Sequence, residues 1–195
     1  MRGRISRDCE PPGRRMRHDH DRTTLMPQFS TRRRVKHSAA KMFDLVADIE
    51  RYPEFVPLCR FMRVIRRAQF VDREVVVAEM TVAYKLIRES FTSRVTLDRV
   101  EQTILVEYLD GPFSRMENRW TFRHIDDRAG DDAGAAQAAC AVEFFISYEF
   151  RSRTLGLLMG AVFDTAFRRF ASAFERRADA VFGPGPAVCQ RFGAP

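Results

Sequence analysis

The chain has 195 residues, of which 45% are hydrophobic, so it is long enough to form one compact domain with a core. Its net charge of +7 is concentrated in residues 1–34, which hold ten Arg and four acidic residues and leave 23 basic and 22 acidic residues for the remainder. A broad basic face for direct DNA binding is therefore not expected, and no apolar run reaches the 18 residues that a membrane-spanning helix needs.

Both ends of the chain are predicted to be tails. Residues 1–25 are expected to be a disordered basic tail, because a Pro-Pro-Gly sequence breaks any periodicity and almost no apolar side chain could be buried there. This tail lacks the apolar run of a secretory signal, so we expect a cytoplasmic protein. Translation starts at either Met1 or Met26. Residues 183–195 contain a Pro-Gly-Pro sequence and are predicted to form a flexible tail.

The segment between the tails, residues 26–182, has the alternation of apolar and polar residues that is typical of strands. Ser38 is a suitable N-cap for a short helix that buries Met42 and Phe43 on its apolar face. A further short helical piece is expected around the prolines that follow. The expected strands are residues 29–36, 60–67, 74–84, 86–97, 103–109, 113–125 and 140–150, with a surface loop over residues 126–139.

A long helix with one apolar face is predicted over residues 154–182. Such a helix would span roughly 43 Å at 1.5 Å per residue. Consecutive antiparallel strands with short turns should form one curved sheet, and this helix can cover its apolar face. The sequence therefore predicts an α+β fold, a curved antiparallel sheet wrapped around the long C-terminal helix. Whether the large inward side chains fill the interior or line a cavity stays open at this stage. The apolar helix positions are Leu155, Leu158, Met159, Val162, Phe163, Ala166, Phe167, Phe170 and Phe174.

No catalytic or metal-binding motif is found in the sequence. The four Cys residues have no CxxC spacing, and the motifs of serine hydrolases, phosphate-binding loops and zinc proteases are absent. His18 and His20 lie in the predicted tail, which lacks the surrounding groups that orient metal ligands. Glu79, Glu89 and Asn118 are the polar residues nearest an inward register, and an ion pair with an Arg is the expected arrangement for Glu89. We expect no enzymatic activity, no metal and no catalytic cofactor.

Four short sequences carry a resemblance to a known family. They are RYPEFVPLC at residues 51–59, DGPF at residues 110–113, WTF at residues 120–122, and FERRA at residues 174–178 in the long helix. With them, residues 26–182 resemble the coenzyme Q-binding START-domain family. That family is polyketide cyclase/dehydrase-like and includes the ribosome association toxin family.

The resemblance implies a START-like helix-grip fold with a hydrophobic tunnel between the sheet and the last helix. It implies non-enzymatic binding of ubiquinone or a related polyprenyl lipid, in support of respiration or ubiquinone biosynthesis. A peripheral contact with the inner membrane is part of that expectation. The rival function is that of a toxin that binds the large ribosomal subunit and inhibits subunit association. The nearly neutral domain favours the lipid, because a ribosomal partner would favour a broader basic surface.

The expected ligand contacts lie on the inward faces of the strands, on the long helix and in residues 52–59. Pro53 and Pro57 would make residues 52–59 a rigid, irregular segment that covers an apolar mouth. A Gly-Pro turn would place Phe113 at the sheet rim beside Leu109. The expected contact residues are Tyr52, Phe55, Val56, Leu58, Met80, Tyr84, Phe91, Tyr108, Phe113, Met116, Trp120, Phe144, Leu158, Val162, Phe163 and Phe167.

Overall fold

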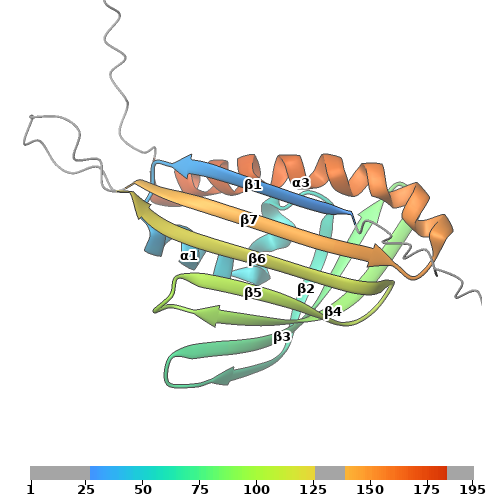
Figure 1. The fold of residues 1–195 in the computed structure, drawn as a ribbon, viewed down its shortest axis with the longest axis horizontal. Helices are drawn as coiled ribbons and strands as arrows, with labels where there is room; N and C mark the ends of the chain where they lie inside the picture. The colour runs from blue at the N-terminus through green and yellow to red at the C-terminus, as the bar shows by residue number, and fades with distance from the viewer. Residues whose placement is uncertain (1–26, 126–138, 184–195) are drawn as a thin grey trace, which may run out of the picture.

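The computed structural model describes residues 27–125 and 139–183. The predicted tails, except Gly183, and all but the last residue of the predicted loop over residues 126–139 lie outside this part of the chain. Figure 1 shows the long C-terminal helix lying along a curved sheet. The elements are β1 (Gln28–Val35), α1 (Ala39–Ala47), η1 (Ile49–Arg51), α2 (Tyr52–Phe55), β2 (Cys59–Gln69), β3 (Arg73–Tyr84), β4 (Ile87–Asp98), β5 (Thr103–Asp110), β6 (Phe113–Ile125), β7 (Ala139–Phe150) and α3 (Arg153–Phe182).

The strands form one antiparallel sheet in the order β1-β7-β6-β5-β4-β3-β2. From β2 to β7, each strand pairs with the next one along the chain, as the sequence predicts. β1 instead pairs with β7, with Arg33 opposite Val142. The alternation pattern does not reveal this pairing, because it joins strands from opposite ends of the domain sequence.

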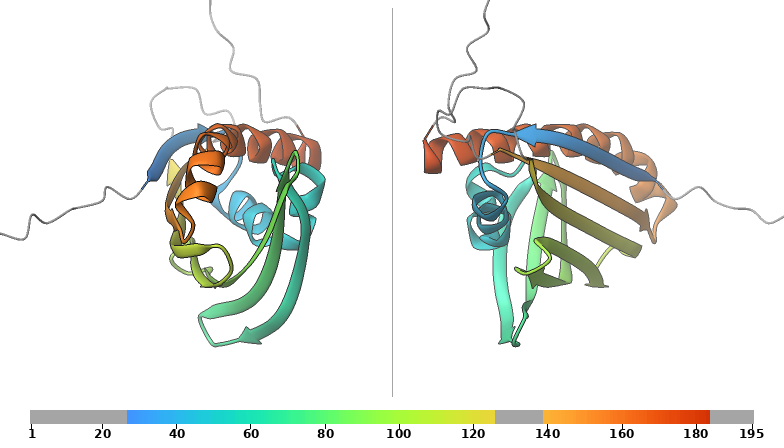
Figure 2. Two further views of the ribbon diagram at one scale, coloured as in Figure 1. Left: turned by 90° about the vertical axis from the view of Figure 1, so that its right-hand side faces the viewer. Right: turned by 60° about the vertical axis from the view of Figure 1, so that its left-hand side comes forward.

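The sheet is bent into a trough, and α3 spans its open side. Figure 2 shows β2, β3 and β4 on one wall of this trough and β6 and β7 on the other. α1 and α2 lie at one end, where α1 packs against β5, β6, β7 and α3. The predicted α+β architecture, a curved antiparallel sheet around the long helix, is confirmed.

α3 begins and ends where its sequence predicts, to within one residue. The Ser152 hydroxyl caps its first turn by accepting a hydrogen bond from the Leu155 amide at 3.3 Å, and Gly183 follows its end with φ +83°. Met159, Phe163, Phe167 and Phe174 are among its buried residues. The steps between these positions are four, four and seven residues, so the four side chains share one face of the helix.

The apolar stripe of α3 is narrower than the sequence suggests. Leu158 is 60% exposed, so its predicted place on the inner face is wrong. It lies one residue, and therefore about 100° around the helix, from the buried Met159. Val162 is half-buried and packs on the edge of the core.

α1 closes one end of the trough with the residues that its pattern predicts. The Ser38 hydroxyl accepts a hydrogen bond from the Lys41 amide at 3.3 Å, which confirms Ser38 as the N-cap. Met42 and Phe43 are almost completely buried, and the Phe43 ring packs edge-on against Phe122 of β6 at 5.8 Å. The hydrophobic core therefore includes the apolar face of α1 as well as the inner face of the sheet.

Candidate functional site

An internal cavity of about 100 Å³ lies between the concave face of the sheet and α3. Its wall is made mostly of aliphatic and aromatic side chains from both walls of the trough, from α3 and from residues 46–58. The lining residues are Val46, Ile49, Tyr52, Val56, Pro57, Leu58, Met62, Ala78, Met80, Val82, Phe91, Ser93, Val95, Ile104, Val106, Phe113, Met116, Asn118, Trp120, Ile146, Tyr148, Phe163, Phe167, Phe170 and Phe174.

Aromatic side chains occupy most of the interior. The Trp120 ring lies 4.5 Å from the Phe144 ring and 5.1 Å from the Phe174 ring, measured between centroids. The remaining free volume is smaller than the roughly 300 to 1,000 Å³ of typical ligand pockets. The inward side chains therefore fill the trough for the most part, and a long lipid enters only if some of them move.

On the first wall of the trough, the cavity lies nearest to the surface beside its partly exposed lining residues. Leu58, Met62, Met80 and Phe91 line the cavity there and are only partly buried, whereas most other lining residues are buried. These four residues come from the segment before β2 and from β2, β3 and β4. We call them the mouth residues. They present only apolar atoms and a flexible thioether in each Met, so the mouth suits an aliphatic chain.

Residues 52–58 cover the cavity beside this mouth. The Tyr52 hydroxyl donates a hydrogen bond to the Val46 carbonyl at 2.6 Å. Burial raises the pKa of this hydroxyl above its ordinary range, and the nearby Cys59 and Asp48 act in the same direction. The Tyr52 ring packs edge-on against Phe174 of α3 at 5.5 Å. One side chain therefore ties the cover to both α1 and α3.

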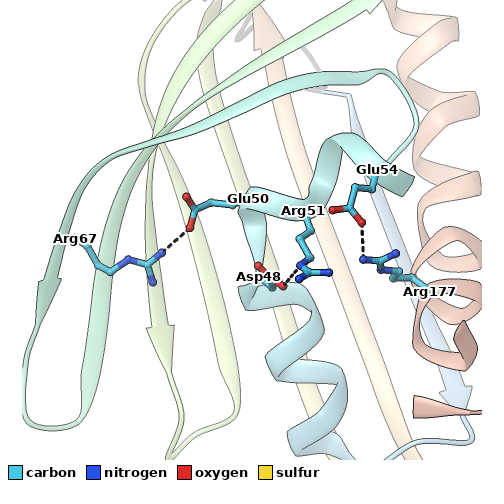
Figure 3. Close-up of polar contacts among 6 residues, drawn as sticks. All are labelled: Asp48, Glu50, Arg51, Glu54, Arg67 and Arg177. Carbon is cyan, nitrogen blue, oxygen red and sulfur yellow. Dashed lines mark hydrogen bonds and ion pairs between the residues drawn. The ribbon is translucent and has the colours of Figure 1, made fainter. Parts of the chain in front are cut away.

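Polar contacts hold the same segment from outside (Figure 3). Glu54 pairs with Arg177 of α3 at 2.6 Å, and the Arg177 guanidinium lies 5.4 Å from the centroid of the Phe55 ring. Just before the cover, Glu50 of η1 pairs with Arg67 of β2 at 3.3 Å. Because these pairs are partly exposed, each contributes little energy alone. Together with the ring contacts they fix where the cover lies.

The cover differs from the predicted irregular segment. Tyr52–Phe55 is a single helical turn with Pro53 at its start, where a missing N–H leaves no hydrogen bond unmade. The chain turns into β2 through Leu58, whose φ of +67° is uncommon for a residue with a side chain. The Leu58 side chain lines the cavity, and its carbonyl accepts a hydrogen bond from the Ala83 amide at 3.0 Å.

Two small polar residues, Ser93 and Asn118, lie in the cavity wall. The Asn118 side-chain oxygen is buried and has no hydrogen-bond partner among the described residues. The other two polar candidates from the sequence do not line the cavity. Glu79 faces outward and pairs with Arg63 at 2.7 Å, and Glu89 is half-buried with no ion pair to an Arg in the part of the chain that the structure describes. The expected Arg partner of Glu89 is therefore wrong.

Most of the predicted contact residues come together in the cavity wall. Their role as ligand contacts stays a prediction. Those that line the cavity are Tyr52, Val56, Leu58, Met80, Phe91, Phe113, Met116, Trp120, Phe163 and Phe167. Phe113 faces inward and lies 5.7 Å from the Tyr108 ring, while Leu109 is exposed, so the predicted rim contact between Phe113 and Leu109 is wrong. Successive residues of a strand face opposite ways, which separates Leu109 from its neighbour Tyr108.

The other predicted contact residues lie away from the cavity. Phe55 packs on the outer side of the cover, and Tyr84 lies in a surface hollow near the end of β3. Phe144 and Val162 belong to the packed core beside the cavity, and Leu158 is exposed. Tyr108 also packs against the core, with its hydroxyl buried and without a partner among the described residues.

Several lining residues are absent from the predicted set. Strand alternation predicts four of them, because each shares a face with a predicted contact on its own strand or the next. They are Ala78, Ser93, Val106 and Ile146. The predicted contacts are large side chains, so the small residues Ala78 and Ser93 are not among them. Phe174 lies one helical turn beyond Phe170 on α3 and belongs to the same stripe.

Residues 35–175 match the protein family described as polyketide cyclase / dehydrase and lipid transport. The chain belongs to this family. The ribosome association toxin RatA of Escherichia coli strain K12 is 32% identical over 162 residues, which cover 81% of this chain and 90% of the toxin. The coenzyme Q-binding protein COQ10 homolog B, mitochondrial, of Xenopus laevis is 27% identical over 157 residues, which cover 80% of this chain and 59% of that protein.

A solved structure carries the same fold. A START superfamily protein from Mycobacterium smegmatis aligns with a TM-score of 0.60, covering 79% of this chain and 98% of that one at 16% identity. This likeness concerns the fold alone, and it confirms the START-like helix-grip architecture of this family member. Within residues 27–125 and 139–183, no helix is long and apolar enough to cross a membrane.

Proposed function

We propose that this protein binds a polyprenyl quinone, such as ubiquinone, in the internal cavity and catalyses no reaction on it. The observation that carries the proposal is the apolar cavity beneath α3 with its apolar mouth. The Xenopus relative, which is named as a coenzyme Q-binding protein, supports a quinone as the ligand. The role that follows is to carry the quinone for respiration or for ubiquinone biosynthesis.

Uptake of such a ligand requires the interior to open. Met62 and Met80 at the mouth have three rotatable bonds each and can move at low cost. Each buried methylene of an isoprenoid chain then contributes about 0.8 kcal/mol, which offsets the loss of contacts between the displaced side chains. The head of the ligand would lie in the existing cavity, and its chain would leave through the mouth.

Two measurements test the proposal. Mass spectrometry of an organic extract from the purified full chain should detect a polyprenyl quinone. Trp120 lines the cavity and is the one tryptophan of the sequence, so added ubiquinone should quench its fluorescence to saturation. An extract free of isoprenoid lipid, combined with unchanged Trp120 fluorescence, contradicts the proposal.

A blocking variant sharpens this test. Ala78 is 2% exposed and lines the cavity on β3, so Ala78→Phe should fill the free volume and abolish quenching. Overpacking should cost about 1 to 3 kcal/mol of stability, and circular dichroism checks that the fold survives. The matched control is Ala83→Phe on the same strand, where Ala83 lines a surface hollow instead of the cavity. Full quenching in folded Ala78→Phe would place the quinone elsewhere.

A second candidate function is inhibition of translation through the large ribosomal subunit. It is favoured by the 32% identity to a protein named as a ribosome association toxin, over 90% of that protein. Sedimentation of the full chain with purified ribosomal subunits tests it. If the protein comigrates with the large subunit and lowers the fraction of joined subunits, this function is supported. If Ala78→Phe also retains that effect, the cavity is not needed for it.

We further propose that the protein contacts an anionic membrane surface where it loads its ligand, from a cytoplasmic position at the inner membrane. Leu86 in the β3–β4 turn is fully exposed, and Leu157 in the first turns of α3 is 85% exposed. Figures 1 and 2 show this turn and the N-terminal half of α3 at the same end of the molecule. The neighbouring cations Lys85, Arg88 and Arg153 are exposed and complement anionic head groups.

A further inference from the structure

Asn118 is a polar residue in an apolar setting. It lies on β6 between Met116 and Trp120 in the inward register, with Val106 of β5 and Ile146 of β7 directly opposite it. All four of these neighbours line the cavity with apolar atoms. The Asn118 side-chain oxygen is buried without a hydrogen-bond partner among the described residues. No described residue therefore uses the amide oxygen.

A second polar group lies in the same wall. Ser93 of β4 is 95% buried, since its exposed fraction is 5%, and it lines the cavity between Ala78 and Tyr108 on the flanking strands. No described residue hydrogen-bonds to its side chain. Ser93 and Asn118 lie two strands apart, which corresponds to roughly 10 Å across the sheet, and they are offset by two residues, roughly 7 Å, along the strands. A ring-sized molecule between them could contact both.

The chemistry of these groups defines what they can hold. A hydrocarbon in the cavity would leave a desolvated amide and a desolvated hydroxyl without partners, which is unfavourable. An oxygen-bearing ring avoids that loss. The amide offers both an acceptor and a donor, so it can donate to a carbonyl oxygen or accept from a hydroxyl. The same side chain therefore suits both the oxidised and the reduced form of a quinone.

The size of the cavity agrees with a ring as its occupant. Its free volume of about 100 Å³ is comparable to that of an apolar cavity of about 150 Å³ in another protein, which takes up benzene. The mouth residues, by contrast, offer only apolar atoms and thioether sulfur. The polar groups thus lie where a head group fits, and the apolar surface lies where a chain would leave.

We propose that Asn118, assisted by Ser93, is the anchor that selects an oxygen-bearing ring and fixes the ligand with its head inside the cavity and its chain through the mouth. This inference rests on the proposed quinone-binding function and adds the residues that determine specificity and orientation. It also predicts discrimination between ligands: the affinity for a molecule with the same chain but no ring oxygen should not depend on Asn118.

The test compares decylubiquinone with decylbenzene, which has the same chain length and no oxygen. Binding of each to the full chain is measured by isothermal titration calorimetry for the natural protein, Asn118→Leu and Ser93→Ala. Asn118→Leu keeps the volume and removes the amide, so it should weaken decylubiquinone binding about tenfold, consistent with one lost hydrogen bond. Decylbenzene binding should be unchanged or tighter. Ser93→Ala should weaken decylubiquinone binding by a smaller factor in the same direction.

The control is Glu117→Gln on the same strand, because Glu117 faces outward and pairs with Arg119 at 2.6 Å. It should bind both probes as the natural protein does. Unchanged decylubiquinone affinity in folded Asn118→Leu, or an equal loss for both probes, overturns the anchor while leaving quinone binding intact. Binding of neither probe to the natural protein overturns the proposed function and the anchor together. If Asn118→Leu does not fold, Ser93→Ala decides by the same comparison.

Discussion

Cys59 and Cys140 show how burial determines the chemistry of single side chains in this protein. Both thiols are buried, Cys59 at the start of β2 and Cys140 near the start of β7. Burial raises the pKa of each to about 11, although a hydrogen bond with the Phe61 backbone acts in the opposite direction for Cys59. A thiol is the inert form of the side chain. These cysteines are therefore expected to be structural.

The first prediction concerns their reactivity. With a pKa of about 11, roughly one thousandth of each thiol is thiolate at pH 8. Iodoacetamide should therefore modify Cys59 and Cys140 far more slowly in the folded protein than in urea, with a rate that rises about tenfold per pH unit up to about pH 11. Peptide mass spectrometry follows each site. Equal rates in the folded and unfolded chains would contradict the burial of these thiols.

The same shifts affect stability in the alkaline range. Because the folded-state pKa is raised, the unfolded chain releases these protons first. The stability that the two protonated thiols contribute is complete below the ordinary thiol pKa and is lost as the pH rises through about 11. Tyr52 shifts in the same direction and adds to this loss.

At this scale the sequence predicts side-chain direction well on strands and less well on α3. Strand alternation has a period of two, so a residue is either inward or outward, and Met80, Phe91 and Trp120 lie inward as expected. The apolar stripe of a helix has edges, and a residue at such an edge can be either buried or exposed. Leu158 and Val162 lie at such edges, and apolar character alone does not separate them from Phe163.

The cover segment, residues 52–58, is held in place partly by side-chain contacts with α3. Arg177 contacts it twice, through the ion pair with Glu54 and through the face of the Phe55 ring. The Arg177 side chain is 20% exposed, so its aliphatic part is also packed. Arg176, the preceding residue, is exposed, and it forms no ion pair or ring contact with a described residue.

The second prediction uses this pair of neighbours. Arg177→Ala removes the ion pair, the cation–π contact and some packing, which together should cost about 1 to 2 kcal/mol. Amides of residues 52–58 should then exchange with deuterium faster, because the cover opens more often. Arg176→Ala has the same change of charge and should leave this exchange unchanged. Equal acceleration in both variants would show that charge, and not the contact, governs the cover.

Among the elements, the sequence predicts local structure and misses long-range contacts. The strands from β2 to β7 follow from alternation and turn residues, and α1 and α3 follow from their apolar periodicity and caps. The helical turn at Tyr52–Phe55 agrees with the short helical piece expected around the prolines, since Pro53 is compatible with the start of a helix and Pro57 follows its end. The pairing of β1 with β7 depends on the closed shape of the whole sheet.

At the scale of the whole molecule, several ion pairs form on the outer face of the sheet. Arg94 pairs with Glu107 at 2.9 Å, and Arg119 pairs with Glu117 at 2.6 Å. Arg63 and Glu79 form a third pair across β2 and β3. Within these pairs each positive charge is offset by a neighbouring negative charge. The described residues still hold 24 basic and 18 acidic side chains, so cations outside these pairs are available to anionic head groups or to a polyanion.

The last prediction concerns the membrane contact. The β2–β3 and β3–β4 turns lie at opposite ends of β3, which at 12 residues separates them by roughly 40 Å. Each turn exposes one apolar side chain almost completely, Val71 in the first and Leu86 in the second. Only the second turn lies at the end of β3 that is near Met80 and the mouth, and it carries Lys85 and Arg88 beside the leucine. If a membrane receives the mouth, the two turns should behave differently.

The double variant Leu86→Asp and Leu157→Asp should therefore lose most of its binding to vesicles containing anionic lipid, measured by flotation of the full chain. Added salt should weaken binding of the natural protein, because it screens the cationic part of the contact. Val71→Asp introduces the same charge at the far turn and should float as the natural protein does. An equal loss in Val71→Asp would mean that vesicles respond to general charge. Undiminished flotation of the double variant would place the membrane contact on another face, away from the mouth through which the ligand is expected to pass.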